Sequence, residues 1–138
     1  IAREYLFKPL GILSASLNEN ALGQALCFYE FNISPLDWVK FGLLVLNQGS
    51  WQGNQLIQPE YIRLMGQASQ AYNPKYYLLS RKLHEPPGFG NILMTGSYIF
   101  HYPEKHMIII RMNSQDKTKK MPSWEQSKAS ALISSFFQ

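Results

Sequence analysis

The sequence is poor in cysteine, and this shortage limits the kinds of site that it can build. Cys27 is the only cysteine among 138 residues, which excludes an internal disulfide and any metal site built from several cysteines. A lone cysteine of this kind is typically a small hydrophobic core residue. Charged residues make up 16% of the chain and hydrophobic residues 46%, a balance typical of a folded globular domain and not of a disordered chain.

Long apolar runs and broad basic faces are missing as well. No apolar run approaches the roughly 20 residues that cross a bilayer, and no basic-then-apolar leader is visible at the start. The sequence therefore predicts no membrane segment.

The net charge of +4 comes partly from Lys117, Lys119 and Lys120. We interpret this cluster as a solvated loop and expect no nucleic-acid partner, because nucleic-acid sites usually combine a broader basic face with aromatic residues.

Residues 1–70 are predicted to be mainly helical. Residues 1–8 are typical of a helix end with Ala2, Tyr5 and Leu6 on one face, and Pro9 stops this helix. A turn at residues 9–11 follows, and the polar, aperiodic residues 14–24 predict a surface loop. Residues 28–31 are expected to be a short extended piece.

The clearest helix signal begins at Ser34, a good N-cap, with Pro35 at the first helical position and Asp37 in the first turn. Gly49 is expected to close this helix in the left-handed conformation. A tight connection at residues 50–54 follows, and Pro59 opens a shorter helix that ends at Gly66. The apolar positions of the first helix recur at helical spacing and predict its buried face: Leu36, Val39, Leu43 and Leu46, widened by Trp38, Phe41 and Val45.

Residues 71–138 are predicted to form strands and a closing helix. Residues 76–79 have strand composition, residues 85–88 a turn composition, and residues 91–102 alternate as one strand. After a turn at 103–105, residues 107–110 predict a second strand that is buried on both faces. A polar loop and a helix from Pro122 follow, and this helix offers Trp124, Ala131, Ile133 and Phe136 as an apolar face. The chain is therefore expected to be one α+β domain, 1–138, with a small antiparallel sheet and a C-terminal helix packed on it.

Three segments, in this order, resemble the β-lactamase-related serine hydrolases, which comprise class C-type β-lactamases, DD-peptidases and related esterases. The first is Glu4-Tyr5-Leu6-Phe7-Lys8-Pro9-Leu10-Gly11, similar to the family's F-x-P-L-G junction. The second is the helix and turn from Ser34 to Ile57, and the third is Gly96-Ser97-Tyr98 followed by Pro103-Glu104-Lys105. The resemblance covers most of the chain but corresponds to the C-terminal part of the family's domain alone.

The resemblance implies acyl-transfer chemistry, but we expect this chain to lack some of the motifs that this chemistry needs. The family uses S-x-x-K for the nucleophile and its lysine, Y-x-N or S-x-N for a second proton-handling group, and K-T-G or H-x-G on the substrate strand. The first two precede the P-L-G junction in the family, so we expect both to be absent here. No catalytic residue is assigned, and the chain is expected to be inactive by itself.

Three strings imitate these motifs. Ser114-Gln115-Asp116-Lys117 matches S-x-x-K, but it lies in a polar loop after a strand, where no helix start holds the serine. Ser16-Leu17-Asn18 matches S-x-N but follows the P-L-G junction, and we interpret it as a polar turn. Lys117-Thr118-Lys119 lacks the glycine that would let a ligand approach the strand.

The substrate-strand motif has two candidate positions. Met94-Thr95-Gly96 is K-T-G with methionine in place of lysine, whereas the G-S-Y alignment places the motif upstream, near Gly88-Phe89-Gly90. Neither position retains the cation that would bind a substrate carboxylate. An ordinary strand is the favoured interpretation of both. We expect no metal at His84, His101 or His106, which have no cysteine or carboxylate at ligand spacing, and no cofactor.

Two hypotheses follow. The chain is the C-terminal fragment of such a hydrolase, needing an N-terminal segment to act on a lactam, peptide, ester or amide. Alternatively, it is a truncated, non-catalytic relic that self-associates or binds. In both cases an incomplete domain exposes apolar surface, including a face of the long helix, so we expect a homo-oligomer or association with the missing segment. Family members are often exported, but the compartment of this chain stays open.

Overall fold

The computed structural model describes residues 1–24, 31–67, 76, 77, 80–83, 87–93, 97–112, 133, 135 and 136. The elements of the first half are the π-helix η1 (Arg3–Phe7), strands β1 (Ser16–Leu17) and β2 (Phe31–Asn32), helix α1 (Pro35–Leu46), strands β3 (Ser50–Trp51) and β4 (Asn54–Gln55), and helix α2 (Pro59–Met65). Those of the second half are β5 (Tyr76–Tyr77), β6 (Ser80–Leu83), β7 (Gly88–Ile92), β8 (Tyr98–Tyr102), the 3-10 helix η2 (Pro103–Lys105) and β9 (Met107–Arg111).

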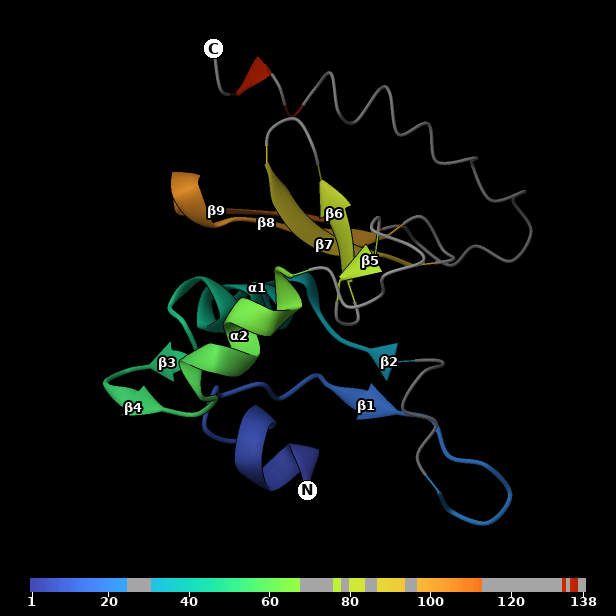
Figure 1. Ribbon diagram of the computed structural model, residues 1–138. Coiled ribbons are helices and arrows are strands. Elements are labelled where there is room, and N and C mark those ends of the chain that lie inside the picture. The colour runs from blue at the N-terminus through green and yellow to red at the C-terminus, as the bar shows by residue number, and fades with distance from the viewer. Residues whose placement is uncertain are drawn as a thin grey trace, which may run out of the picture.

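An antiparallel sheet of order β5-β6-β7-β8-β9 is the centre of the fold. Figure 1 shows α1 and α2 together on one side of this sheet. Two small antiparallel pairs, β1-β2 and β3-β4, lie outside it. The predicted α+β class is confirmed. β6 was not predicted. β1 was not predicted either, because a strand of two residues is too short to leave a periodic pattern, and the sequence predicted only a loop there.

Helix α1 begins as the sequence predicts. The Ser34 hydroxyl accepts a hydrogen bond from the Asp37 backbone N–H at 3.2 Å, and Pro35 occupies the first turn. At the other end the Gly49 backbone N–H bonds to the Leu44 carbonyl, and Gly49 has φ +82°. A Cβ at Gly49 would overlap the Ile57 carbonyl oxygen. The left-handed glycine is therefore required both by its φ angle and by the close return of the chain.

The buried face of α1 differs from the predicted one. Gly42 and Val45 turn toward the sheet side, and Asp37 and Leu44 turn toward the N-terminal segment. Trp38 is also buried. Leu36 and Leu43 are exposed, at 79% and 37%. The prediction is confirmed for Trp38 and Val45, which are buried, and wrong for Leu36 and Leu43, because Gly42 adds no hydrophobicity to a periodicity count. Its missing side chain nevertheless lets the helix approach the sheet, since a Cβ there would lie 2.8 Å from Ile108 Cδ1.

The predicted strand at residues 91–102 is two strands. β7 and β8 pair antiparallel, with Asn91 opposite Ile99 and Ile92 opposite Tyr98. The Leu93 backbone N–H donates to the Ser97 carbonyl at 2.8 Å and closes the connection between them. A hairpin conserves the in-out alternation on both of its arms, so its period-2 pattern is indistinguishable from that of one long strand.

Side chains cover both faces of the sheet. Tyr98, Phe100 and Tyr102 form one cluster with Ile133, while on the other face Phe89 packs with Val45 and Ile62. β9 was predicted to be buried on both faces, but it is only half-buried. Ile109 packs against the first cluster, and Ile108 lies against Gly42 of α1. The predicted loop at residues 113–121 and most of the closing helix lie outside the described residues. Ile133 is buried as expected, whereas Phe136 is 68% exposed and does not join this core.

The first helix packs only one residue of the predicted face, Leu6, against the core. Tyr5 is 75% exposed, whereas Leu6 and Phe7 pack against a cluster of Leu10, Ile12 and Leu44. The Lys8 backbone N–H bonds to the Arg3 carbonyl, the longer hydrogen-bond spacing of a π-helix.

Candidate functional site

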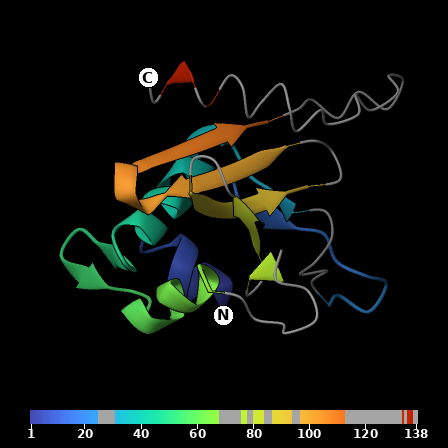
Figure 2. The ribbon, with the colours of Figure 1, turned by 45° about the horizontal axis from the view of Figure 1, so that its top comes forward.

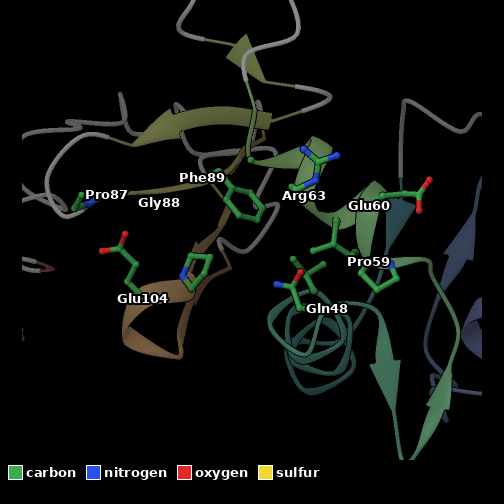
Figure 3. A pocket seen from close by; sticks show the side chains of 12 residues that line it. Gln48, Pro59, Glu60, Arg63, Pro87, Gly88, Phe89 and Glu104 are labelled. Carbon is green, nitrogen blue, oxygen red and sulfur yellow. The ribbon is translucent and has the colours of Figure 1, made fainter.

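A pocket of about 490 Å³ lies between the C-terminal end of α1, helix α2, strand β7 and the turn at η2. Gly88 and Phe89, two of the predicted substrate-strand residues, line it. Figure 3 shows the Phe89 ring between Glu104 on one side and Arg63 and Glu60 on the other. The structure thus brings part of the predicted strand motif to the wall of a hollow that is large enough for a small organic molecule.

The pocket has an apolar wall and a charged rim. Val45, Ile62 and Phe89 form the buried part of the wall, and they pack against one another as a core cluster. Glu60, Arg63 and Glu104 are exposed at the rim. No hydroxyl, thiol, amine or imidazole group stands among the lining residues that the structure describes. This arrangement can hold a molecule with an apolar body, but it offers no nucleophile for acyl transfer.

The predicted substrate-strand residues of β7 have few backbone groups free to pair with a ligand, because β7 is an inner strand of the sheet. Gly88, Phe89 and Gly90 pair with β6 on one side, and Phe89 and Gly90 pair with β8 on the other. A Cβ at Gly88 would overlap the His101 carbonyl oxygen, and one at Gly90 would overlap the Ile99 carbonyl oxygen. The close strands therefore explain both glycines without a ligand. Met94, Thr95 and Gly96 lie outside the described residues, and their role as a substrate strand stays a prediction, as does that of Gly88–Gly90.

His101 is an unusual residue beside this pocket. It is 2% exposed, and its ring stacks on that of Phe89 with centroids 5.1 Å apart and 17° between the planes. Neither ring nitrogen has a hydrogen-bond partner of good geometry among the described residues. Burial lowers the pKa of His101 to about 4, and a backbone contact with Phe89 opposes this shift only in part. The imidazole is therefore neutral at pH 7.

No metal site emerges from the part of the chain that the structure describes. It contains no group of three or more His, Cys, Asp or Glu residues that could hold an ion. His101 lies in the core on β8, whereas His106 is exposed after η2, with φ +48°. His84 and Cys27 lie outside the described residues. In the same ranges, no helix is long and apolar enough to span a bilayer.

The strongest polar cluster is one that sequence reasoning missed. Asp37 Oδ2 accepts hydrogen bonds from the Leu13 and Ser14 backbone N–H groups and from the Ser14 hydroxyl, at 3.1, 2.9 and 2.7 Å. Asp37 Oδ1 pairs with Lys40 Nζ at 2.7 Å. These bonds, of which that from Lys40 counts most, hold the pKa of Asp37 far below its ordinary value. The sequence signals Asp37 only as a first-turn acid, since its partners Leu13 and Ser14 lie more than twenty positions away.

This cluster places a serine, a lysine and a carboxylate together, but its bonds are those of a structural tie. The Ser14 hydroxyl gives its proton to Asp37 and accepts from the Ser34 backbone N–H at 2.8 Å. Lys40 Nζ is bound to Asp37 and to the Gly11 carbonyl at 2.5 Å. A carboxylate whose pKa is this low is a poor general base. The cluster therefore anchors residues 11–14 to the start of α1.

The fold of this chain, with helices on one face of an antiparallel sheet, is similar to a β-lactamase-like structure. The comparison that establishes this is with the crystal structure of a "putative beta-lactamase" from Bacteroides dorei DSM 17855, at a TM-score of 0.66 over 97% of this chain. The sequence identity is 12%, so the likeness is one of fold. This chain spans 49% of the length of that one. No protein-family model and no curated protein matches the sequence.

Proposed function

We propose that this chain is the scaffold portion of a β-lactamase-related serine hydrolase domain and does not perform acyl transfer by itself. The observation that carries the proposal is the extent of the structural match, which includes 97% of this chain and 49% of its neighbour. The order of the three sequence segments supports the same family. The substrate class of a completed domain, whether lactam, peptide, ester or amide, is not distinguished by these features.

The hydrogen bonds of three described serines, Ser14, Ser34 and Ser80, support the proposal that the chain is inactive by itself. Ser80 is 4% exposed and donates its hydroxyl proton to the Met65 carbonyl at 2.7 Å. Ser34 caps α1, and Ser14 is held by Asp37. A serine nucleophile needs an adjacent base that can take its proton, together with donors aimed at the developing oxyanion. None of these three serines has both.

Turnover measurements test this proposal. The purified chain is expected to hydrolyse a chromogenic β-lactam and a p-nitrophenyl ester no faster than buffer does, because Ser14, Ser34 and Ser80 are held in structural hydrogen bonds and Ser114 is not expected at a helix start. Ser114→Ala and Ser14→Ala are the matched variants, and both should give the same baseline as the native chain. Turnover that is abolished by either substitution would identify a working nucleophile and overturn the proposal.

The second candidate function is a non-catalytic module that binds or self-associates. The pocket beside Phe89, with its apolar wall and without a nucleophile, favours this alternative. The reading frame upstream of Ile1 distinguishes the two. An in-frame S-x-x-K followed by Y-x-N would support a piece of an enzyme, whereas a frame that lacks both would support a relic.

A further inference from the structure

His101 lies at one end of the ladder that joins β7 to β8. Because β8 runs between β7 and β9 in the sheet (Figure 2), His101 has Phe89 opposite it on one side and Ile108 opposite it on the other. Phe89 and His101 form the last pair of this ladder. The end of a ladder opens at a lower free-energy cost than its centre, because fewer backbone hydrogen bonds break.

The imidazole at this ladder end is buried in a place that does not suit a charge. His101 is stacked on the Phe89 ring, and neither of its nitrogens has a hydrogen-bond partner of good geometry among the described residues. A protonated ring would carry a positive charge and two N–H donors there, without acceptors for them. It is therefore stable only in a conformation in which the ring reaches water.

No counter-ion compensates for this burial in the part of the chain that the structure describes. Burial lowers the pKa of His101, a backbone contact with Phe89 opposes this, and no charged neighbour contributes. β7 carries no titratable residue, and the one charge of β9, Arg111, lies opposite Tyr98 at the far end of β8.

The other titratable groups near this end of the sheet also leave His101 without a partner. Tyr98 and Tyr102 of β8 itself pack in the cluster on the opposite face. The charged or titratable groups of the remaining elements are either paired with each other or exposed: Asp37 with Lys40 in α1, Glu60 and Arg63 in α2, Lys82 in β6, Glu104 and Lys105 in η2, and His106 after it.

We propose that the Phe89–His101 pair is a proton-operated latch, closed while the imidazole is neutral and opened locally when the imidazole binds a proton. Opening separates the end of β7 from β8 and releases the Phe89 ring, while the rest of the sheet and α1 stay folded. Phe89 packs with Val45 and Ile62 and forms part of the pocket wall, so the latch makes the shape of this wall depend on pH. This inference does not depend on whether the chain derives from a hydrolase.

Two features of the fold confine the opening to this end. The ladder between β7 and β8 continues from Gly90 to Ile92, and these pairs do not involve His101. The core cluster of Leu10, Ile12 and Leu44 shares no buried residue with the cluster of Phe89. Release of the Phe89 ring therefore leaves that second cluster intact.

Nuclear magnetic resonance of the native chain between pH 7 and pH 4 tests the proposal. The imidazole C–H signal of His101 reports its protonation, and the methyl signals of Val45 and Ile62 report the position of the Phe89 ring. We expect these signals to change together, with a midpoint near the pKa of about 4 that burial gives His101. The methyl signals of Leu10 and Leu44 should keep their native positions over the same range.

His101→Phe separates the latch from the carboxylates that titrate in the same range. In this variant the methyl signals of Val45 and Ile62 should stay at their native positions throughout. Simultaneous change of all four residues in the native chain would mean global unfolding and would overturn the proposal. Protonation of His101 without any change at Val45 and Ile62, or with a midpoint near 6.5, would overturn it as well.

Gly88→Ala should open the latch without acid. A Cβ at Gly88 would overlap the His101 carbonyl oxygen and lie 2.8 Å from Tyr102 Cδ1. The variant is therefore expected to raise the midpoint of His101 by about one pH unit or more, a tenfold or greater gain in proton affinity.

Gly53→Ala is the matched control for this second variant. It places alanine at φ +82° with no atom within 4 Å, so it strains the chain without touching the latch. The midpoint of His101 in the control should equal that of the native chain. An unchanged midpoint in Gly88→Ala, or an equal shift in the control, would contradict the latch. If Gly88→Ala does not fold, the native titration and His101→Phe still decide the question.

Discussion

Replacing Gly90 with alanine is expected to destabilise the protein by about 3 kcal/mol, the upper end of the usual cost of overpacking. The built Cβ would overlap the Ile99 carbonyl oxygen and lie 2.7 Å from Phe100 Cδ1 and 2.9 Å from Phe100 Cα. Two of these three neighbours are backbone atoms of β8, which can move only if the ladder between β7 and β8 opens. Urea unfolding, followed by circular dichroism, measures the loss.

Gly66→Ala is the matched control for this substitution. Gly66 ends α2 with φ −92°, which alanine adopts readily, and its nearest built contacts are 3.5 Å away on the Phe89 ring. The control should therefore change the free energy of unfolding by less than about 1 kcal/mol. A Gly90→Ala protein as stable as this control would show that β7 does not approach β8 this closely, and would reopen a ligand-based explanation for the glycine.

Acidification is expected to destabilise the native protein through His101. The unfolded chain protonates this imidazole near its ordinary pKa of 6.5, whereas burial holds the pKa in the folded chain at about 4. Between these two values the unfolded state binds the additional proton, so stability falls as the pH falls from about 6.5 to about 4. The total loss from this one group is about 3 kcal/mol.

His101→Phe should remove this loss, because phenylalanine can still stack on Phe89 but binds no proton. Unfolding free energies at pH 7, 5.5 and 4.5, at one fixed protein concentration, measure the slope. His106→Asn, at an exposed left-handed position, is the control and should keep the native slope. Asp37 adds a separate acid loss below about pH 4 in all three proteins, since its folded pKa is depressed. An unchanged slope in His101→Phe would mean that His101 is not buried as described.

The local features of the fold were predictable because neighbouring residues determine them. Ser34, Pro35 and Gly49 set the ends of α1, and Pro59 sets the start of α2. The α+β class followed from these helices and the apolar strands. Family resemblance, and not periodicity, indicated the β-lactamase-like fold that the structural match now shows.

The features that sequence reasoning missed depend on contacts between distant parts of the chain. Asp37 gains its partners from residues 11–14, and no local pattern announces that meeting. The orientation of α1 depends on Gly42, whose importance lies in the atoms it lacks. The pocket likewise combines residues of α1, α2, β7 and η2 that no sequence motif links. Only Gly88 and Phe89 among its lining residues were candidates beforehand.

The most direct test of the central proposal, that this chain does not form an acyl-enzyme by itself, is intact-mass spectrometry after incubation with excess chromogenic β-lactam. The proposal predicts a single species at the unmodified mass, even after prolonged incubation. A species heavier by one opened β-lactam, mapped by peptide digestion to any serine and above all to Ser114, would contradict it.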